Sequence, residues 1–123
     1  MLRNYKDLKV WQKSYNLCLL IYKVTSDFPR QEQYNLVSQI RRTAVSLPSN
    51  IAEGYGRKTT VEYIRYLYIA YGSHCELETQ VSLSGDLELI KPDILDKIQQ
   101  DIAEVERMLK SLINSLEKKL SAP

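Results

Sequence analysis

Residues that build tight turns, disulfide frameworks and metal sites are scarce in this sequence. Only four glycines and four prolines occur among 123 residues, which is too few for a turn-rich β protein and typical of a few long elements. The two cysteines, Cys18 and Cys75, lie far apart in the chain and have no zinc or redox spacing. We expect free thiols that pack as small apolar residues, in keeping with a reducing compartment.

Strong charge of either sign and long apolar runs are also missing. The formal net charge is +2 and the pI is about 8.5, a balance that does not by itself indicate a nucleic-acid partner. Charges occur throughout residues 1–14, so this stretch does not resemble a signal peptide. No apolar run is long enough to cross a membrane. We therefore expect a cytoplasmic protein.

Catalytic and cofactor signatures are absent. The sequence has no G-x-S-x-G, no Walker A motif and no G-x-G-x-x-G. His74 is the only histidine, so the paired Glu-x-x-His motifs of a di-iron bundle cannot form. His74 and Glu78 lie one helical turn apart, but two ligands do not make a metal site. We predict that His74 is a core or interface histidine hydrogen-bonded to a neighbour, and we expect no catalytic residue, cofactor or metal.

Four segments place apolar residues at helical spacing, at roughly 7–27, 31–55, 60–86 and 93–119. Hydrophobic residues make up 44% and charged residues 26% of the chain, as in a globular protein. Thr59 and Glu62 have the spacing of a capping box before the third segment. Because the connections are short, the sequence predicts an all-α fold, an up-down-up-down antiparallel four-helix bundle in one domain spanning 1–123.

The second helix contains residues that usually interrupt a helix. Its C-terminal part, residues 39–59, reads QIRRTAVSLPSNIAEGYGRKT. The apolar register continues through Pro48, which predicts a helix kinked at the proline rather than a loop. Gly54 and Gly56 are expected to end the helix. In the third helix, Gly72 is expected to mark a close approach between helices, because glycine weakens a helix interior.

The first helix has two opposed apolar stripes. One gathers Leu8, Trp11, Tyr15, Cys18, Leu19 and Tyr22, and the other gathers Val10, Leu17, Ile21, Val24 and Phe28. A bundle helix needs one apolar stripe, so we predict that the second stripe meets another subunit. The alternative is that the chain itself covers both sides. Tyr68 and Tyr71, on a tyrosine-rich flank of the third helix, are assigned to the same oligomer interface.

Polar residues follow one side of the second and third helices. They are Gln39, Arg42, Ser46, Asn50 and Glu53, followed by Ser73, Glu76, Gln80 and Ser84. If these residues are buried, each group must find a hydrogen-bond partner, and the two ladders would join the helices. Solvated faces are the alternative, and both interpretations stay open.

Basic residues gather around the second helix and the following turn. They are Arg41, Arg42, Arg57, Lys58 and Arg65, with Tyr55, Tyr63 and Tyr66 nearby. Guanidinium groups beside aromatic rings suit RNA phosphates and unstacked bases. We therefore predict a basic patch that binds nucleic acid. A solvated surface partly neutralised by Glu53 and Glu62 is the alternative.

Three stretches resemble a known family. They are LKVWQKSYNLCLLIYKVTSDFP (8–29), QIRRTAVSLPSNIAEGYGRKT (39–59) and YLYIAYGSHCELETQ (66–80). Each is similar to a signature of the four-helix-bundle proteins encoded in intervening sequences of bacterial 23S ribosomal RNA genes, which carry a ribosomal-protein-like label. The resemblance covers nearly the whole chain. It implies rings of five subunits and kinship to accessory proteins of diversity-generating retroelements, which are basic pentamers that bind nucleic acid. It brings no catalytic residue.

The sequence thus predicts a non-enzymatic homo-oligomer, a pentamer by resemblance, that binds RNA or another nucleic acid through repeated basic patches. A protein-binding scaffold without a nucleic-acid role is the alternative. An enzyme or metal protein is the third, least supported interpretation.

Overall fold

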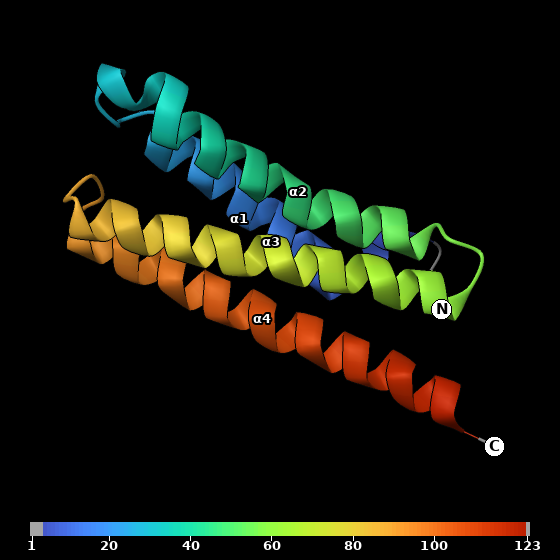
Figure 1. Cartoon of the computed structure of the whole chain (residues 1–123). Helices are drawn as coiled ribbons and strands as arrows, with labels where there is room; N and C mark the ends of the chain where they lie inside the picture. Colours follow the sequence, from blue (N-terminus) through green and yellow to red (C-terminus); the bar gives the residue numbers. More distant parts are fainter. Residues whose placement is uncertain (1–3, 123) are drawn as a thin grey trace.

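Four long helices run alternately up and down in the computed structural model, which describes residues 4–122 (Figure 1). They are α1 (Lys9–Thr25), α2 (Ser38–Tyr55), α3 (Thr60–Asp86) and α4 (Pro92–Ser121). α1 and α3 each pack against both α2 and α4, and the α2–α3 contact is the most extensive. The prediction of an all-α antiparallel four-helix bundle is confirmed.

Shorter helical turns precede α1 and α2. They are the 3-10 turns η1 (Tyr5–Asp7) and η2 (Arg30–Glu32) and the π turn η3 (Gln33–Val37). The predicted range 60–86 coincides with α3, and the predicted second helix corresponds to η2, η3 and α2 together. Thr59 accepts a hydrogen bond from the backbone N–H of Glu62 at 3.2 Å, as the capping box requires. Residues 1–3 and 123 of the predicted domain lie outside the described residues.

α2 continues without interruption through Pro48, which is buried. The continuity is as predicted, and the bend at the proline stays a prediction. Gly54 has another role than the one predicted. It lies inside α2, and a Cβ placed on it would approach the Tyr66 Cβ to 2.7 Å. Gly54 therefore sets the close approach of α2 to α3. Gly56 is the residue that caps α2, with a right-handed backbone.

The chain's own core contains most of the α1 stripe that was predicted to meet another subunit. Val10, Leu17, Ile21 and Phe28 are all less than 9% exposed and pack among the core residues of the other helices. This part of the interface prediction is wrong, because residues already buried within one chain leave no surface for a second. Val24 is half-buried at the edge of the core.

His74 lies fully inside the bundle, where it joins α3 to α4. Its Nε2 is 2.7 Å from the carbonyl oxygen of Ile102, and because a carbonyl can only accept, Nε2 carries the hydrogen. The Nδ1 atom has no partner among the described residues. The ring stacks against Tyr71 at 6.1 Å between centroids. The prediction of a hydrogen-bonded core histidine is confirmed.

The predicted polar ladders meet at one point between α2 and α3. Ser46 Oγ lies 2.9 Å from Ser73 Oγ. Asn50 Nδ2 donates to the Ser46 carbonyl at 2.8 Å and to its hydroxyl at 2.9 Å. Buried Ser84 donates to the Gln80 carbonyl within α3 at 2.8 Å. The polar residues therefore form a short bonded layer rather than a continuous zipper.

Gly72 does not mark a close approach within the chain. A Cβ added to this residue would meet no atom within 4 Å. The residue is exposed on the outer side of α3, so that expectation is corrected. The tight glycine of this hairpin is Gly54, because its α2 position directly faces the aromatic residues that begin α3.

We expect Tyr63→Phe to stabilise the protein by about 1 kcal/mol, because the buried Tyr63 hydroxyl has no hydrogen-bond partner. Burial, with a smaller effect of Tyr55, raises the pKa of Tyr63 from 10.0 to about 12. The folded state then holds the proton more tightly than the unfolded state does. The contribution of Tyr63 protonation to the free energy of unfolding is therefore complete below pH 10 and is lost as the pH rises toward about 12.

Urea unfolding at pH 7 and across this alkaline range measures both effects. The variant should unfold at higher urea and lose less stability above pH 10 than the original protein. A variant that is less stable at pH 7 would show that the hydroxyl makes a stabilising hydrogen bond.

Candidate nucleic-acid interface

Arg57, just after the end of α2, lies against the first turns of α3. Its guanidinium carbon is 4.6 Å from the centre of the Tyr66 ring, and Nη2 donates to the Tyr66 hydroxyl. The same Nη2 lies 3.0 Å from Glu53 Oε1, one helical turn earlier. The close α2–α3 approach at Gly54 brings these side chains together. An arginine thus lies on an aromatic ring at an exposed end of the bundle.

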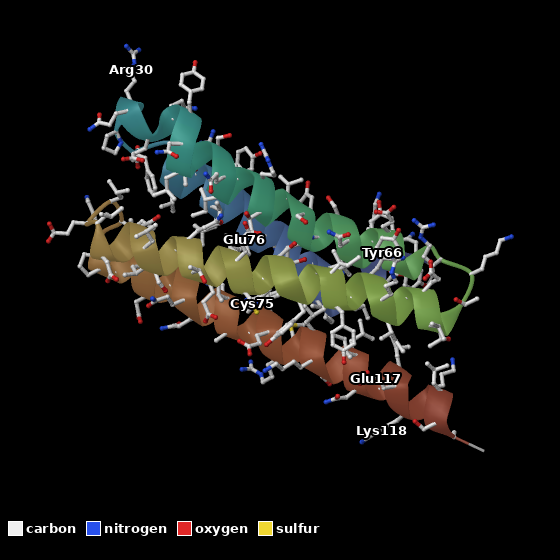
Figure 2. The ribbon with its side chains drawn as sticks, viewed as in Figure 1. Arg30, Tyr66, Cys75, Glu76, Glu117 and Lys118 are labelled. Atoms are coloured by element: carbon white, nitrogen blue, oxygen red, sulfur yellow. The ribbon has the colours of Figure 1, made fainter. Side chains whose placement is uncertain are left out.

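Arg65 approaches the same ring from α3. Its guanidinium carbon is 5.8 Å from the Tyr66 centroid, and Nη1 is 3.6 Å from Glu62 Oε2. Lys58 lies exposed in the turn between the helices and makes no ion pair with any described residue. Figure 2 shows Tyr66 near the end of the bundle where α2 and α3 join. The structure therefore brings Arg57 and Arg65 together at one tyrosine, with Lys58 next to Arg57 in the turn.

Arg41 does not belong to this cluster. Its Nε donates to Thr25 Oγ1 at 2.9 Å, and its Nη2 donates to the Tyr22 carbonyl at 3.1 Å. These contacts lie at the C-terminal end of α1, where the Tyr22 carbonyl also accepts the backbone N–H of Ser26 at 3.2 Å. Sixteen residues separate Arg41 from Arg57, or about 24 Å along a helix. Arg41 therefore links α2 to the C-terminal end of α1 by hydrogen bonds. The five cations do not form a single patch.

Arg42 is exposed on α2 next to Arg41, and no described residue pairs with it. It lies in the same half of α2 as Arg41 and so is also remote from the turn. The sequence spacing already contains this separation, because about 16 residues of helix span about 24 Å, but the prediction of one patch did not use it. The exposed cluster at the turn is thus Arg57, Lys58 and Arg65 with Tyr66, which we call the turn cluster.

The turn cluster can offer two kinds of contact to a nucleic acid. Guanidinium and ammonium groups bind phosphate oxygens, and a tyrosine flanked by arginines can stack against an unpaired base. Glu53 and Glu62 compete for the same arginines within the free protein. Both ion pairs are solvent-exposed and therefore weak, of the order of 0–1 kcal/mol. A phosphate can displace them at small cost.

A second exposed feature is apolar and lies between α1 and α2. Tyr15 is 45% and Leu19 56% exposed on α1, and Val45 is exposed beside them on α2. Trp11 stacks on Tyr15 with 4.9 Å between ring centroids. A groove of about 310 Å³ runs along these residues and is also lined by Pro48. We call this surface the α1–α2 ridge. Tyr15 and Leu19 belong to the α1 stripe that the sequence prediction left facing the bundle core.

The two cysteines differ in environment. Both are free, Cys18 half-buried and Cys75 exposed. Burial raises the pKa of the Cys18 thiol, so this group is held in its less reactive form. The expectation that both thiols pack as small apolar residues holds for Cys18 and is wrong for Cys75. Cys75 projects from the outer side of α3 instead of entering the core.

Among residues 4–122, no three or more His, Cys, Asp or Glu side chains gather closely enough to hold a metal ion. None of the helices in this range combines the length and apolar character needed to cross a membrane.

Comparison with known proteins identifies the family. A family model described as 23S rRNA-intervening sequence protein matches residues 6–111. None of the curated proteins matches the chain. A crystal structure of a protein of unknown function from the S23 ribosomal protein family of Bacteroides thetaiotaomicron VPI-5482 is similar, with a TM-score of 0.76 and 27% sequence identity. The match covers 85% of this chain and 97% of that one. The chain therefore belongs to the 23S rRNA-intervening sequence protein family.

Proposed function

We propose that this chain is a non-enzymatic homo-oligomer that binds RNA. The observation that carries the RNA-binding part is the turn cluster, in which Arg57 and Arg65 both lie over the Tyr66 ring. Lys58 stands beside them without an ion pair among the described residues. Cations placed around an aromatic face suit a single-stranded segment, which exposes phosphates and unstacked bases together.

The α1–α2 ridge supports the self-association part of the proposal. Large apolar side chains that share one exposed surface are typical of an interaction site, and tyrosine and tryptophan are enriched in such interfaces. We assign this ridge to contacts between copies of the chain, in place of the buried α1 stripe. Tyr68 and Tyr71 on α3 stay candidates for the same role.

Oligomerisation would repeat the turn cluster and strengthen RNA binding. Three cations alone give weak, salt-sensitive binding, whereas several linked copies raise the apparent affinity through effective concentration. Five subunits is the number implied by the family resemblance, and it is part of the proposal. The expected kinship to accessory proteins of diversity-generating retroelements agrees with this function and stays a prediction.

A protein-binding scaffold is the second candidate function. The observation in its favour is the same ridge, because its apolar residues could receive a different protein as readily as a second copy. The scaffold interpretation predicts no RNA affinity, so the test below separates the two functions.

We expect Arg57→Gln/Lys58→Gln to weaken RNA binding about tenfold at low salt, because two phosphate-binding cations are lost. Fluorescence anisotropy of an unstructured RNA oligonucleotide, titrated at about 50 and 200 mM salt, measures the effect. The matched control is Lys23→Gln/Lys91→Gln, which removes the same charge from exposed residues near the other end of the bundle.

The control variant should bind as the original protein does. Absence of RNA binding by the original protein at low salt would contradict the proposed function and favour the scaffold. Equal losses in the two variants would show that net charge, and not the turn cluster, determines affinity.

A further inference from the structure

Charge is unevenly divided along the bundle, although the net charge is small. The α2–α3 turn and the C-terminal end of α4 lie at one end, and the α3–α4 turn lies at the other (Figure 1). Residues 4–13, 47–72 and 103–122 form the half with the α2–α3 turn and contain ten basic and six acidic residues. Residues 14–46 and 73–102 form the opposite half and contain six basic and nine acidic residues. One half is thus basic and the other acidic.

The outer face of α4 in the basic half carries cations and small polar residues together. A shallow groove of about 550 Å³ is lined by Arg107, Lys110, Ser111, Asn114, Ser115 and Lys118. Residues 107, 111, 114 and 118 follow helical spacing, so they form one stripe about 16 Å long. Figure 2 shows Lys118 projecting away from the bundle on the outer side of α4.

A second groove continues this surface onto α1. It is about 530 Å³ in volume and shares Arg107, Ser111 and Ser115 with the first groove. Its α1 side includes Lys9, which adds a cation from a different helix. Neither groove is lined by an aspartate or a glutamate. We call the combined surface the α4 face.

The neighbouring acids on α4 are already paired or engaged. Glu106 binds Lys110 at 2.7 Å. Glu104 binds Lys13 at 3.2 Å, and Glu117 accepts a hydrogen bond from the Tyr68 hydroxyl at 2.9 Å.

Three cations of the α4 face stay without an acidic partner. Among the described residues, no ion pair involves Lys9, Arg107 or Lys118. Favourable interaction with the helix dipole accounts for Lys118, which lies in the last turn of α4. It does not account for Arg107, several turns earlier, or for Lys9 on α1. These cations are therefore available to an external anion, as are other unpaired cations of the described residues. The α4 face differs from those in gathering Arg107 and Lys118 with Ser and Asn side chains in one groove.

We propose that the α4 face binds the sugar-phosphate backbone of RNA. This inference rests on the proposed RNA-binding function and adds a second contact surface to it. Arg and Lys side chains supply the charge, and Ser and Asn side chains donate hydrogen bonds to phosphate oxygens and ribose hydroxyls. The expected ligand is a run of phosphodiester groups lying along the stripe, with Arg107 and Lys118 at its two ends and Ser111 and Asn114 between them.

The α4 face differs from the turn cluster in what it can recognise. No aromatic residue lines either of its grooves. Tyr71 lies in an adjoining pocket that shares Lys110 and Asn114, and the Lys110 ammonium already lies 5.5 Å from the centre of its ring. Backbone contacts carry no sequence information. The α4 face should therefore contribute equally to binding of single-stranded and of hairpin RNA, whereas the turn cluster should favour single strands. The acidic half of the bundle would repel RNA and so orient it toward the basic half.

The test is a salt titration of RNA binding by Arg107→Gln/Lys118→Gln. Each phosphate contact contributes roughly 0.7–0.9 to the slope of log affinity against log salt, so the slope should fall by roughly 1.4–1.8. The fall should correspond to the same two contacts in both ligands, roughly 1.4 for an unstructured RNA oligonucleotide and roughly 1.8 for a hairpin RNA. Lys23→Gln/Lys91→Gln is again the charge-matched control, and thermal unfolding confirms that each variant folds.

The outcomes separate the two proposals. If the original protein binds RNA but the α4 variant keeps the slope of the control, the α4 face is not a binding site and the proposed function stands. If the original protein binds no RNA at low salt, both proposals are wrong. Phosphatidylserine vesicles test a lipid source of phosphate. A variant that loses vesicle binding while its RNA binding is unchanged overturns the assignment to RNA.

Discussion

Gly54→Ala should destabilise the protein by about 2–3 kcal/mol, a large change for the addition of one methyl group. The new Cβ would lie 2.7 Å from the Tyr66 Cβ and 3.2 Å from the Tyr63 carbonyl oxygen. Neither atom is the flexible tip of a side chain, so the backbones of α2 and α3 must separate. Because α2 and α3 share the most extensive contact in the bundle, the cost should appear in global unfolding.

Gly72→Ala provides the matched control for this prediction. Gly72 lies in a helix as Gly54 does, but an added Cβ there meets open space. Alanine should stabilise this position by about 1 kcal/mol, because glycine is the poorer helix former. Urea unfolding of both variants measures the difference. Similar stability changes in the two variants would contradict the role given to Gly54 in the α2–α3 packing.

Tyr15→Glu/Leu19→Glu should dissociate the oligomer, weakening association about 100-fold or more. Both side chains are exposed on the α1–α2 ridge, so the change should leave the folded chain intact. A buried charge in an apolar interface has no partner and therefore costs far more than the lost contact alone. Light scattering at micromolar concentration measures the mass of the particle, with circular dichroism to confirm that the helices persist.

Ile69→Glu/Leu83→Glu is the control for the self-association surface. These residues are exposed on the outer side of α3 and resemble the ridge residues in size and exposure. The control should keep the mass of the original protein. A monomer from this variant, with an oligomer retained in the ridge variant, would move the interface to α3. A monomeric original protein would show that neither surface is used.

The helices and their order could be predicted from the sequence because their signals are local. In α4, apolar residues recur at helical spacing from Ile94 onward, and Pro92 suits the first helical position. The bounds of α3 follow from the cap at Thr59 in the same way. Helix formation depends on neighbours within one or two turns, and the sequence shows these neighbours directly.

The orientation of α1 could not be predicted from its two apolar stripes. Both are hydrophobic, and periodicity alone does not say which one faces the bundle. Composition carries a usable signal, because the buried stripe has Val10, Leu17 and Ile21, whereas the opposite stripe has the exposed Tyr15 and Tyr22. Aliphatic residues are more often fully buried than tyrosines, whose hydroxyl favours contact with water. The interface prediction failed because it gave no weight to this difference.

The candidate site was only partly predictable for a different reason. Arg57, Lys58 and Arg65 are neighbours because a tight turn joins their helices, and that turn can be recognised in the sequence. The role of Arg41 depends on carbonyl groups at the end of α1, which lie far away in the sequence. The α4 face depends on Lys9 of α1 and Arg107 of α4 lining one groove. Contacts of this kind require the packed structure.

Sedimentation velocity of the protein with a labelled, unstructured RNA oligonucleotide is the most direct test of the central claim that an oligomer of this chain binds RNA. At about 50 mM salt the RNA should sediment with a particle heavier than one subunit plus one RNA, and at about 200 mM it should be released. RNA that sediments alone at the lower salt concentration would contradict the account.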